Sequence, residues 1–425
     1  MPPLTREYDI TVLGATGWTA AICAEHITRT FPTTLKWCLA GRSRSKLLSL
    51  SDHLRALNPD RLAPVIHTIP ELTAEQLNPL AQQTKILING IGPYHAYSTP
   101  VVAACASSGT HYVDFSTETP WIVDMVKSYD SIAKGSGAII IPAISNCSSP
   151  SDLVAWMLAT WVKGNQPPGE TINHVLCSGR LTMLGMQGGS LMTLLGVAEK
   201  YGIGQYNSGD AWAMSSQQRP QKHVSWPSQR LTGYLYDDTL GHLTTSIVAG
   251  SNEAVVQRSA GLKPDLYGPD FTFREYQPAS GMMGAILVHI LTKLGILLLA
   301  TPWFRAFLRW FSYEPGSGPD RETSRKKERM DFSAIGFLKG HRKPVAAARF
   351  TYNGALVDIS AILAVEAAGT LLELNLDSNS SPLRPRGMCT PSTLGMPFVE
   401  RLRQVGVEIL VEPIFPTVNA ERWTT

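Results

Sequence analysis

The stretch Gly14-Ala15-Thr16-Gly17-Trp18-Thr19-Ala20 decides the fold of the first part of this chain. It follows a run rich in Ile, Val and Leu at 8–13 and precedes a helical pattern at 18–29, so we interpret it as a strand-to-helix turn. Glycines in such a turn let the backbone approach a pyrophosphate, and the helix offers its N-terminus to the anion. The alternative is a tight turn that binds nothing. The residues predicted to contact the dinucleotide are Gly14, Thr16, Gly17, Trp18 and Thr19.

Strand and helix patterns alternate from this turn to about residue 150. The further strands are expected at 36–40, 63–68, 85–89, 111–115 and 138–142. Buried strands that alternate with helices form a doubly wound parallel sheet. Residues 1–150 are therefore predicted to form a Rossmann domain.

The end of the second expected strand selects the cofactor. Sites specific for NAD place Asp or Glu there, against the ribose hydroxyls. Here the sequence runs Gly41-Arg42-Ser43-Arg44-Ser45-Lys46 and holds no acid. Arg42 can pair with a 2′-phosphate, and Ser43 and Lys46 can add donors, so we predict NADP(H). A solvated basic loop is the alternative.

A second loop that contains glycine follows the fourth expected strand. Ligands bind at the carboxyl ends of the strands of an open α/β sheet. Gly92 and Pro93 shape this loop, and Tyr94 either lines the nicotinamide pocket or packs inside the domain. We therefore add Gly92, Pro93 and Tyr94 to the predicted cofactor contacts.

The pattern changes after residue 150. Strands are expected at 172–180, 231–236, 243–249, 270–276, 332–339 and 344–352, with helices near 188–201, 251–260 and 355–373. Strands clustered in this way suggest a mostly antiparallel sheet with helices on one face. The predicted architecture is α/β, a Rossmann domain followed by an α+β substrate domain over 151–380. Residues 381–425, with a helix at 390–405, are expected to return and pack on the Rossmann domain.

Two segments of the second domain stand out. Residues 281–311 are very apolar, but Lys293 near the middle makes a membrane crossing costly. We expect a helical hairpin that covers the substrate cavity or lies on a membrane surface; a buried core helix or a dimer interface is an equal alternative. The polar stretch 314–329 is expected to be an exposed loop.

The composition excludes several classes of protein. A net charge of +3 is too small to argue for a nucleic-acid partner. The six cysteines form no CxxC pair and no His, Cys, Asp and Glu cluster has metal-ligand spacing, so neither a disulfide framework nor a metal site is expected. The short polar N-terminus is not read as a secretory signal. We expect an intracellular protein, cytoplasmic or peripherally attached to a membrane or lipid droplet.

Together these motifs resemble the saccharopine dehydrogenase-like oxidoreductases, a family that includes the trans-acting enoyl reductases of lipid and polyketide pathways. The resemblance is dense over 8–155 and collinear beyond. The matching stretches are 14–20, 39–42, 89–94, 101–106, 111–115, 150–153, 314–319 and 390–391. The resemblance implies NADP(H) use and reduction of an activated double bond, in which hydride goes to the β-carbon of an unsaturated thioester.

Two stretches depart from the family pattern. The position that usually carries Asp before the family's Pro-Ser-Asp is Cys147 here, and the family's Thr-Gly-Glu is Ser116-Thr117-Glu118. Glu118 could orient substrate or relay a proton, or it could be the N-terminal carboxylate of the next helix. Cys147 could be a nucleophile or a buried structural thiol. The candidate catalytic residues are Tyr94, Glu118, Asn146, Cys147 and Ser148.

Two further features are candidates with plain alternatives. His95 could donate a proton, although a histidine near such a loop is more often a surface residue. The stretch Gln187-Gly188-Gly189-Ser190 opens a helix whose amides could receive an anion or a carbonyl, or it is an ordinary helix cap.

The sequence supports three functions. The first is an NADP(H)-dependent oxidoreductase, of the enoyl reductase type, that acts on a hydrophobic acyl or polyketide-derived substrate, free or bound to a carrier or CoA, in a chain that could form a homodimer. The loss of acid at Cys147 suggests the second, a non-redox isomerase or cyclase. Residues 281–311 suggest the third, a lipid-surface binding protein.

Overall fold

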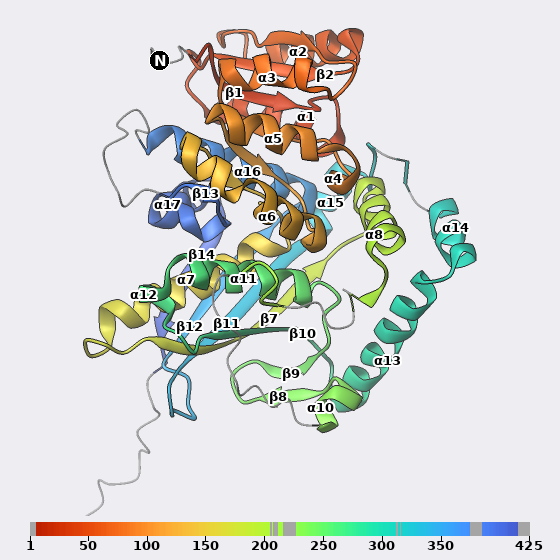
Figure 1. Cartoon of the computed structure of the whole chain (residues 1–425). Coiled ribbons are helices and arrows are strands. Elements are labelled where there is room, and N and C mark those ends of the chain that lie inside the picture. Colours follow the sequence, from red (N-terminus) through yellow and green to blue (C-terminus); the bar gives the residue numbers. More distant parts are fainter. Residues whose placement is uncertain are drawn as a thin grey trace, which may run out of the picture.

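The structure is a computed structural model that describes residues 6–204, 206, 211–215, 227–311, 313–314, 316–374 and 385–414. Two seven-stranded sheets are found within these residues, one above the other in Figure 1. Helices surround the first sheet, and a helical layer separates it from the second.

The first sheet is entirely parallel and has the strand order β13-β6-β5-β4-β1-β2-β3. Its strands are β1 (Tyr8–Leu13), β2 (Trp37–Gly41), β3 (Val65–Thr68), β4 (Thr84–Asn89), β5 (His111–Asp114), β6 (Ile139–Ile141) and β13 (Gly387–Met388). The helices between them are α1 (Trp18–Thr30), α2 (Arg44–Leu57), α3 (Ala74–Gln83), α4 (Tyr94–Tyr97), α5 (Thr99–Ser108) and α6 (Thr119–Ser136). The predicted Rossmann sheet is confirmed, and the late strand β13 extends its edge.

Alternate residues of the central strands point to opposite faces of this sheet. Ile10 and Val12 of β1 join the core formed with α1 and α16 (Leu356–Glu373). Leu13 and Leu87 join the core under α3, α5 and α6. Because both faces are covered, the strands are buried runs of Ile, Val and Leu instead of alternating patterns.

The second sheet has the order β14-β12-β11-β7-β10-β9-β8, and β7 and β10 form its one parallel pair among the described strands. Its strands are β7 (Ile172–Thr182), β8 (Leu235–Asp237), β9 (Gly241–Thr244), β10 (Thr272–Pro278), β11 (Arg329–Leu338), β12 (Ala346–Asn353) and β14 (Glu408–Pro413). The helices around it are α7 (Ser148–Asn165), α8 (Gly188–Tyr201), α10 (Pro227–Thr232), α11 (Ala249–Leu262), α12 (Pro264–Tyr267), α13 (Met282–Leu299), α14 (Pro302–Trp310) and α15 (Arg321–Lys327). The prediction of a second, mostly antiparallel sheet is confirmed.

One hydrophobic core joins the two sheets. Helix α7 packs on β7, β11 and β12, and its residues Leu153 and Leu158 share a core with Ile10 of the first sheet and Phe332 of the second. The first turn of α7 therefore lies between the sheets, just after the carboxyl end of β6.

The C-terminal part of the chain is divided between the sheets. Helix α16 packs on α1, β4 and β5, so the chain returns to the Rossmann sheet before residue 380, the expected boundary. That boundary itself lies outside the described residues. After η1 (Pro391–Leu394) and α17 (Gly395–Gln404), β14 pairs with β12 of the second sheet. The expectation that the whole return packs on the Rossmann domain is wrong for this strand.

Three local predictions in the second domain are also wrong. The strand expected at 231–236 is the end of α10 followed by the short β8, and the one expected at 243–249 ends with β9 at Thr244. The exposed loop expected at 314–329 contains α15. Arg321 of α15 pairs with Glu25 of α1 and with Asp358 of α16, at 2.7 and 2.6 Å, which holds this short helix against the first domain.

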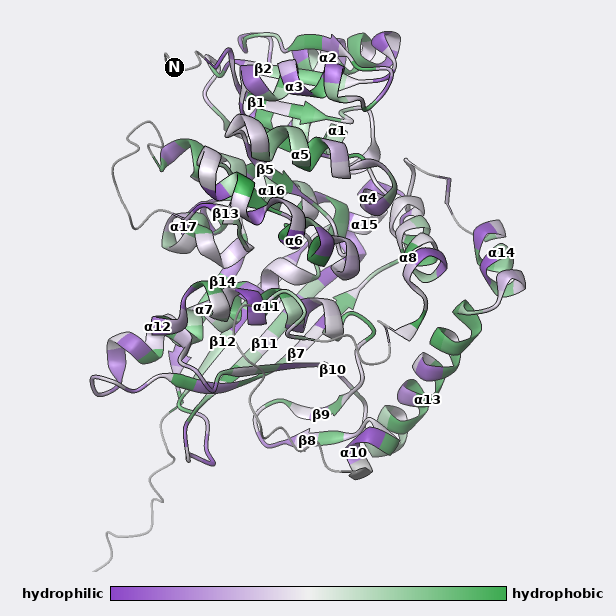
Figure 2. Cartoon of the chain, viewed as in Figure 1, coloured by the Kyte–Doolittle hydropathy of each residue, from purple (hydrophilic) through white to green (hydrophobic). Residues whose placement is uncertain are grey.

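The apolar segment forms α13 and α14, which lie along the outer edge of the molecule (Figure 1). Figure 2 shows α13 as a largely hydrophobic helix at that edge. It is long and apolar enough to cross a membrane, yet only 22% of it is buried. The alternative of a buried core helix is therefore wrong.

Candidate active site

The turn after β1 has the geometry of a phosphate cradle. Gly14 has a φ of +71°, in the left-handed region that favours glycine, and its amide donates to the carbonyl oxygen of Ala40 at 2.8 Å. A Cβ added to Gly14 would lie 2.6 Å from the side chain of Ile91. The turn is thus closed against the loop after β4, and a larger residue would displace one of them.

The N-terminus of α1 is open to an anion. Gly17 is its N-cap, no side chain caps it, and the first turn contains no acid. Thr16 is exposed, while Trp18 and Thr19 are half-buried at the same end. Unpaired amides and the positive end of the helix dipole suit a pyrophosphate, so these residues fit the predicted dinucleotide.

Ala20, the small residue three positions after Gly17, brings α1 close to the end of β4. Ala20 is buried, and a Cβ added to Gly90 would lie only 2.6 Å from the Cβ of Ala20. This contact sets the height of the helix N-terminus above the sheet edge, as expected for the small residue at this place.

The end of β2 presents positive charge to solvent. Arg42 is exposed, and its guanidinium takes part in no hydrogen bond or ion pair within the described part of the chain. Ser43 caps α2 by accepting from the amide of Lys46, at 3.4 Å, and Lys46 is itself exposed. A free arginine beside a helix N-terminus without acids fits a 2′-phosphate.

The loop after β4 is fixed by a buried asparagine. The side chain of Asn89 donates to Ser98 Oγ at 2.8 Å and to the hydroxyl of Tyr112 at 2.9 Å, and it accepts from the amide of Ile91. Gly92 stays exposed and Pro93 half-buried at the sheet edge. Both lie at the edge of the sheet where the cofactor contact is predicted.

Tyr94 is a packing residue in this geometry. Its hydroxyl accepts from the amide of Phe115 at 3.3 Å and is 3.4 Å from the carbonyl oxygen of Asn89, and its ring packs on Trp121. Burial raises the pKa of the phenol well above its usual value. Of the two interpretations of Tyr94, the packing aromatic matches this environment, since its hydroxyl already joins the ends of β4 and β5.

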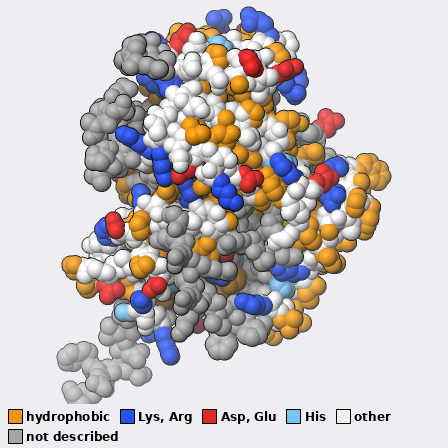
Figure 3. Space-filling model, viewed as in Figure 1, with side chains coloured by type: hydrophobic (Ala, Val, Ile, Leu, Met, Phe, Trp, Pro, Cys, Tyr) orange, Lys and Arg blue, Asp and Glu red, His pale blue; other side chains and the backbone are white. Residues whose placement is uncertain are grey.

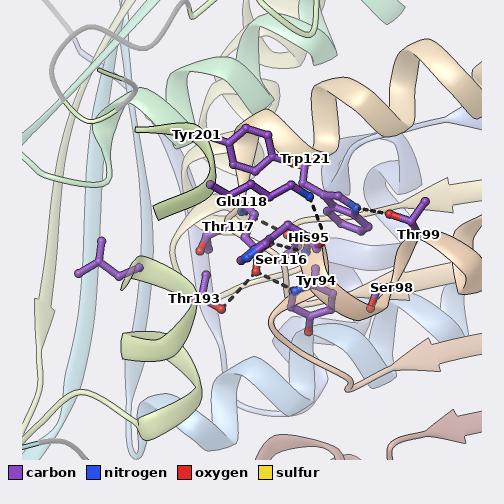
Figure 4. Close-up of polar contacts among 12 residues, drawn as sticks. Tyr94, His95, Ser98, Thr99, Ser116, Thr117, Glu118, Trp121, Thr193 and Tyr201 are labelled. Atoms are coloured by element: carbon purple, nitrogen blue, oxygen red, sulfur yellow. Dashed lines mark hydrogen bonds and ion pairs between the residues drawn. The ribbon is translucent and has the colours of Figure 1, made fainter. Parts of the chain in front are cut away.

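The Glu118 carboxylate caps α4, a helix that precedes it in the chain. One carboxylate oxygen accepts from the amide of Tyr94 at 2.8 Å, and the other accepts from the amide of His95 at 2.7 Å (Figure 4). The two oxygens together satisfy the first amides of α4. Glu118 is also the N-cap residue of α6, as the alternative interpretation placed it, although its side chain makes no cap hydrogen bond to that helix. Thr193 of α8 donates a third hydrogen bond to this carboxylate, to Oε1 at 3.2 Å.

His95 completes a dyad with Glu118. Its Nδ1 lies 2.6 Å from Glu118 Oε2, and the far side of its ring faces α8, where a Cβ added to Gly196 would lie 3.0 Å from Nε2 (Figure 4). Lys200 of α8 donates to the His95 carbonyl oxygen at 3.1 Å. The surface position considered for His95 is wrong, because the dyad sits where α8 meets the Rossmann domain.

Residues 146–148 start α7 beyond the end of β6. The Asn146 amide donates to the carbonyl oxygen of Leu356 at 3.3 Å, and the Cys147 thiol lies 3.4 Å from Asn146 Oδ1. Both side chains are half-buried, whereas Ser148 is buried. Burial raises the pKa of the Cys147 thiol to about 12, so it is protonated at neutral pH and matches the structural-thiol alternative better than a nucleophile.

A buried polar network lies under this helix start. Ser148 donates to Asn252 of α11 at 3.0 Å, and Asn252 donates to Glu275 of β10 at 2.8 Å. Ser151 donates to the other oxygen of Glu275 at 2.5 Å. Burial and, to a lesser extent, the nearby Glu253 carboxyl raise the pKa of Glu275 to about 8. No sequence pattern indicated a role for Glu275, because β10 is more than a hundred residues away from the start of α7 in the chain.

The clusters around residues 94, 118 and 148 are neighbours. Asp114 at the end of β5 accepts from the amides of Ser116 and Ala143, so it joins the loops after β5 and β6. Ser251 of α11 donates to the Thr117 carbonyl oxygen at 3.0 Å, one residue before Asn252. The candidate residues thus line one edge, although the structure gives no direct hydrogen bond between Glu118 and residues 146–148 among the contacts it describes.

The N-terminus of α8 is already hydrogen-bonded to another segment of the chain. The amide of Gly188 donates to the carbonyl oxygen of Ser317 at 3.2 Å, and Gly188 is buried. This contact matches the ordinary cap better than an anion site. Within the described residues, no group of three or more His, Cys, Asp and Glu side chains could hold a metal ion.

Comparison with known proteins places the site in a family. Residues 10–141 match the saccharopine dehydrogenase NADP binding domain. The chain is 27% identical to the trans-acting enoyl reductase of Mycobacterium tuberculosis, over 96% of this chain and 98% of that protein. The trans-acting enoyl reductase of Mycobacterium ulcerans is 26% identical, with 96% and 99% covered.

Among solved structures, that of an amine dehydrogenase from Mycobacterium smegmatis covers 90% of this chain and 95% of its own, at 14% identity and a TM-score of 0.40. The predicted family, the Rossmann fold and NADP(H) as cofactor are confirmed by the domain match and the relatives.

Proposed function

We propose that this chain, whose residues 10–141 match the saccharopine dehydrogenase NADP binding domain, is an NADP-dependent oxidoreductase that reduces an activated carbon–carbon double bond in a hydrophobic acyl or polyketide-derived thioester. The acyl group could be presented on CoA or on a carrier protein. The relatives named trans-acting enoyl reductases support this reaction type, and the residues at the sheet edge support the substrate class.

One observation carries the substrate class. The loops that follow β4, β5 and β6, at 90–93, 115–118 and 142–147, contain no Lys and no Arg. The carboxylates nearest to them, of Asp114 and Glu118, are buried and already accept hydrogen bonds. A substrate with its own carboxylate would need a free cation at this edge, where Lys200 of α8 already donates to the His95 carbonyl oxygen, whereas a neutral thioester carbonyl needs only neutral donors.

The chain's residues can then divide the work. NADPH, held by the turn after β1 and by Arg42, would supply a hydride for the β-carbon of the double bond, whose electron pair would move to the thioester oxygen. Asn146 and the positive end of α7 would stabilise that enolate oxygen. The Cys147 thiol would give its proton to the α-carbon and regain one from water, so that the double bond gains one hydride and one proton.

The test supplies α,β-unsaturated acyl thioesters together with NADPH deuterated at the transferred position. We expect deuterium at the β-carbon of the product, and solvent deuterium at the α-carbon when the reaction is run in heavy water. NADPH oxidation by a keto or imino substrate, with none by any unsaturated thioester, would overturn the proposal.

A second function rests on Cys147. The family position that usually carries Asp is a thiol here, so an isomerase or cyclase that retains the cofactor domain is the competing proposal. Product formation without NADPH consumption in the same assay would favour it. Cys147→Asp should then introduce NADPH oxidation, whereas Cys147→Ser should not.

A further inference from the structure

Helices α13 and α14 carry a continuous row of exposed apolar side chains. In each helix they recur three or four residues apart, which places them on one face. They are between 47% and 81% exposed: Met283, Leu287, Ile290, Leu291, Leu294, Leu297, Trp303, Phe307, Trp310 and Phe311. Figure 3 shows hydrophobic side chains along the rim that these two helices form. We call this set the apolar rim.

The opposite faces of both helices are anchored to the protein. His289 of α13 is buried, its Nδ1 lies 2.7 Å from Thr245 Oγ1, and Thr244 donates to the carbonyl oxygen of Ala285 at 2.7 Å. Phe304 and Leu308 of α14 pack on a small core under α8. The apolar rim is therefore held outward by fixed contacts on the other side of each helix.

The charges of this segment are of one sign. Residues 281–311 contain Lys293, Arg305 and Arg309, and no Asp or Glu. The two arginines contact Glu199 on α8, at 3.2 and 2.7 Å, and Arg309 stays exposed at the edge of the rim. Aromatic side chains flanked by cations and without acids complement an anionic lipid surface.

The rim continues toward the cofactor end of the molecule. After α14 the chain passes Tyr313, which is 43% exposed, and reaches Gly318, where an added Cβ would lie 3.5 Å from Trp18 Nε1. Leu184 and Met186, just before α8, are also exposed. Gly318 thus brings the chain that follows the rim to the first turn of α1.

We propose that the apolar rim binds the surface of an anionic lipid membrane, with α13 and α14 lying in the interface and the cofactor end facing the lipid. Lys293 favours this orientation over a crossing, because a half-exposed lysine can reach the headgroups from a helix that lies flat. The proposal rests on the proposed function only in explaining why the rim leads to the active site, since a hydrophobic acyl substrate would be drawn from the membrane.

The test measures sedimentation of the full chain with vesicles of phosphatidylcholine and phosphatidylglycerol. The variant Leu287→Gln/Leu291→Gln/Trp310→Gln should lose binding by about tenfold or more, and vesicles of phosphatidylcholine alone should bind the natural chain about tenfold less. A control, Leu48→Gln/Leu62→Gln/Ile132→Gln, replaces three exposed apolar residues outside the rim and should bind as the natural chain does.

Affinity for NADPH, measured on each variant, shows that the fold is intact. The proposal is overturned if the natural chain stays in the supernatant with anionic vesicles. In that case, a natural chain that is a dimer in solution and a rim variant that is a monomer would show that the rim is a dimer interface instead. A water-soluble, short-chain unsaturated thioester separates this proposal from the proposed function. The rim variant should reduce it at the natural rate, whereas failure of the natural chain to reduce it would count against the function alone.

Discussion

The two ends of the active-site edge are built in opposite ways. At the cofactor end, beside β1 and β2, the groups expected to touch the ligand are backbone amides and an exposed Arg42, left unpaired by the protein. At the substrate end, beside β5 and β6, Glu118, Ser148 and Glu275 are buried and hydrogen-bonded to the protein itself. The first end keeps its binding capacity for a ligand, and the second uses it to hold loops in place.

The largest effect is expected where the backbone forms the cradle. Gly14→Ala must adopt a φ of +71° and place a Cβ against Ile91, so NADPH affinity should fall about 100-fold, equivalent to about 2.7 kcal/mol. Gly137→Ala is the matched control, because Gly137 has a φ of +84° but open space around the added Cβ. It should lower stability by about 1 kcal/mol and leave NADPH affinity unchanged. Equal losses of affinity, measured by fluorescence titration, would contradict the cradle.

The next effect sharpens the choice of cofactor. Arg42→Ala should raise KM for NADPH by about 10- to 100-fold, the worth of a charge-assisted contact to phosphate, and change KM for NADH by less than about twofold. Arg44→Ala, the exposed arginine two residues later, should change neither. A similar rise in KM for both cofactors in the Arg42 variant would show that Arg42 does not contact the 2′-phosphate.

The cofactor end could be predicted from the sequence because its function is local. The positions of Gly14, Gly17 and Ala20 follow from a turn between one strand and one helix, and Arg42 lies at the end of the next strand. The sheet order then brings these two segments together by a general rule of the fold, without any side-chain contact that is specific to this protein.

The substrate end could be predicted only in part. Tyr94 and Glu118 follow the neighbouring strands β4 and β5, whose ends Asn89 and Asp114 are in register, so their proximity could have been deduced. Nothing in the sequence indicated that Glu118 reaches back to α4, because a helix N-cap is normally the preceding residue. Glu275 was missed since it comes from the second sheet, whose position over α7 depends on long-range packing.

The dyad offers a sharper test of the substrate end. Glu118→Gln keeps the size of the side chain but places an amide NH₂ against one of the donors at Tyr94 or His95, so stability should fall by about 1–3 kcal/mol. The rate kcat should fall about tenfold if the loop also positions substrate, with a smaller change in KM for NADPH. Glu322→Gln, an exposed glutamate, is the control for both thermal unfolding and kinetics.

The last effect is a pH dependence of stability at Glu275, which is spread over several pH units. Its pKa is raised from 4.5 to about 8 on folding, so the folded chain holds a proton that the unfolded chain releases. Stability should therefore decline as the pH rises from about 4.5 to about 8, by at most about 1.4 kcal/mol per pH unit from this group, and level off above. Glu275→Gln cannot release a proton and should flatten this slope, which thermal unfolding at several pH values would measure.

Three other carboxyls contribute to what remains of that slope, and one of them is Glu253, whose pKa burial raises above its usual value. Burial raises the pKa of Asp114 to about 7 and that of Asp152 to about 6, so both act in the same direction as Glu275, but over a narrower range that ends earlier. The Glu275 variant should consequently keep a decline up to about pH 7 and lose the part above it. Glu71→Gln, at an exposed position, should leave the whole curve unchanged. If instead the natural chain gains stability from pH 6 to pH 8, Glu275 is ionised in the folded chain. The substrate end then holds a charged group, as the cofactor end does with Arg42.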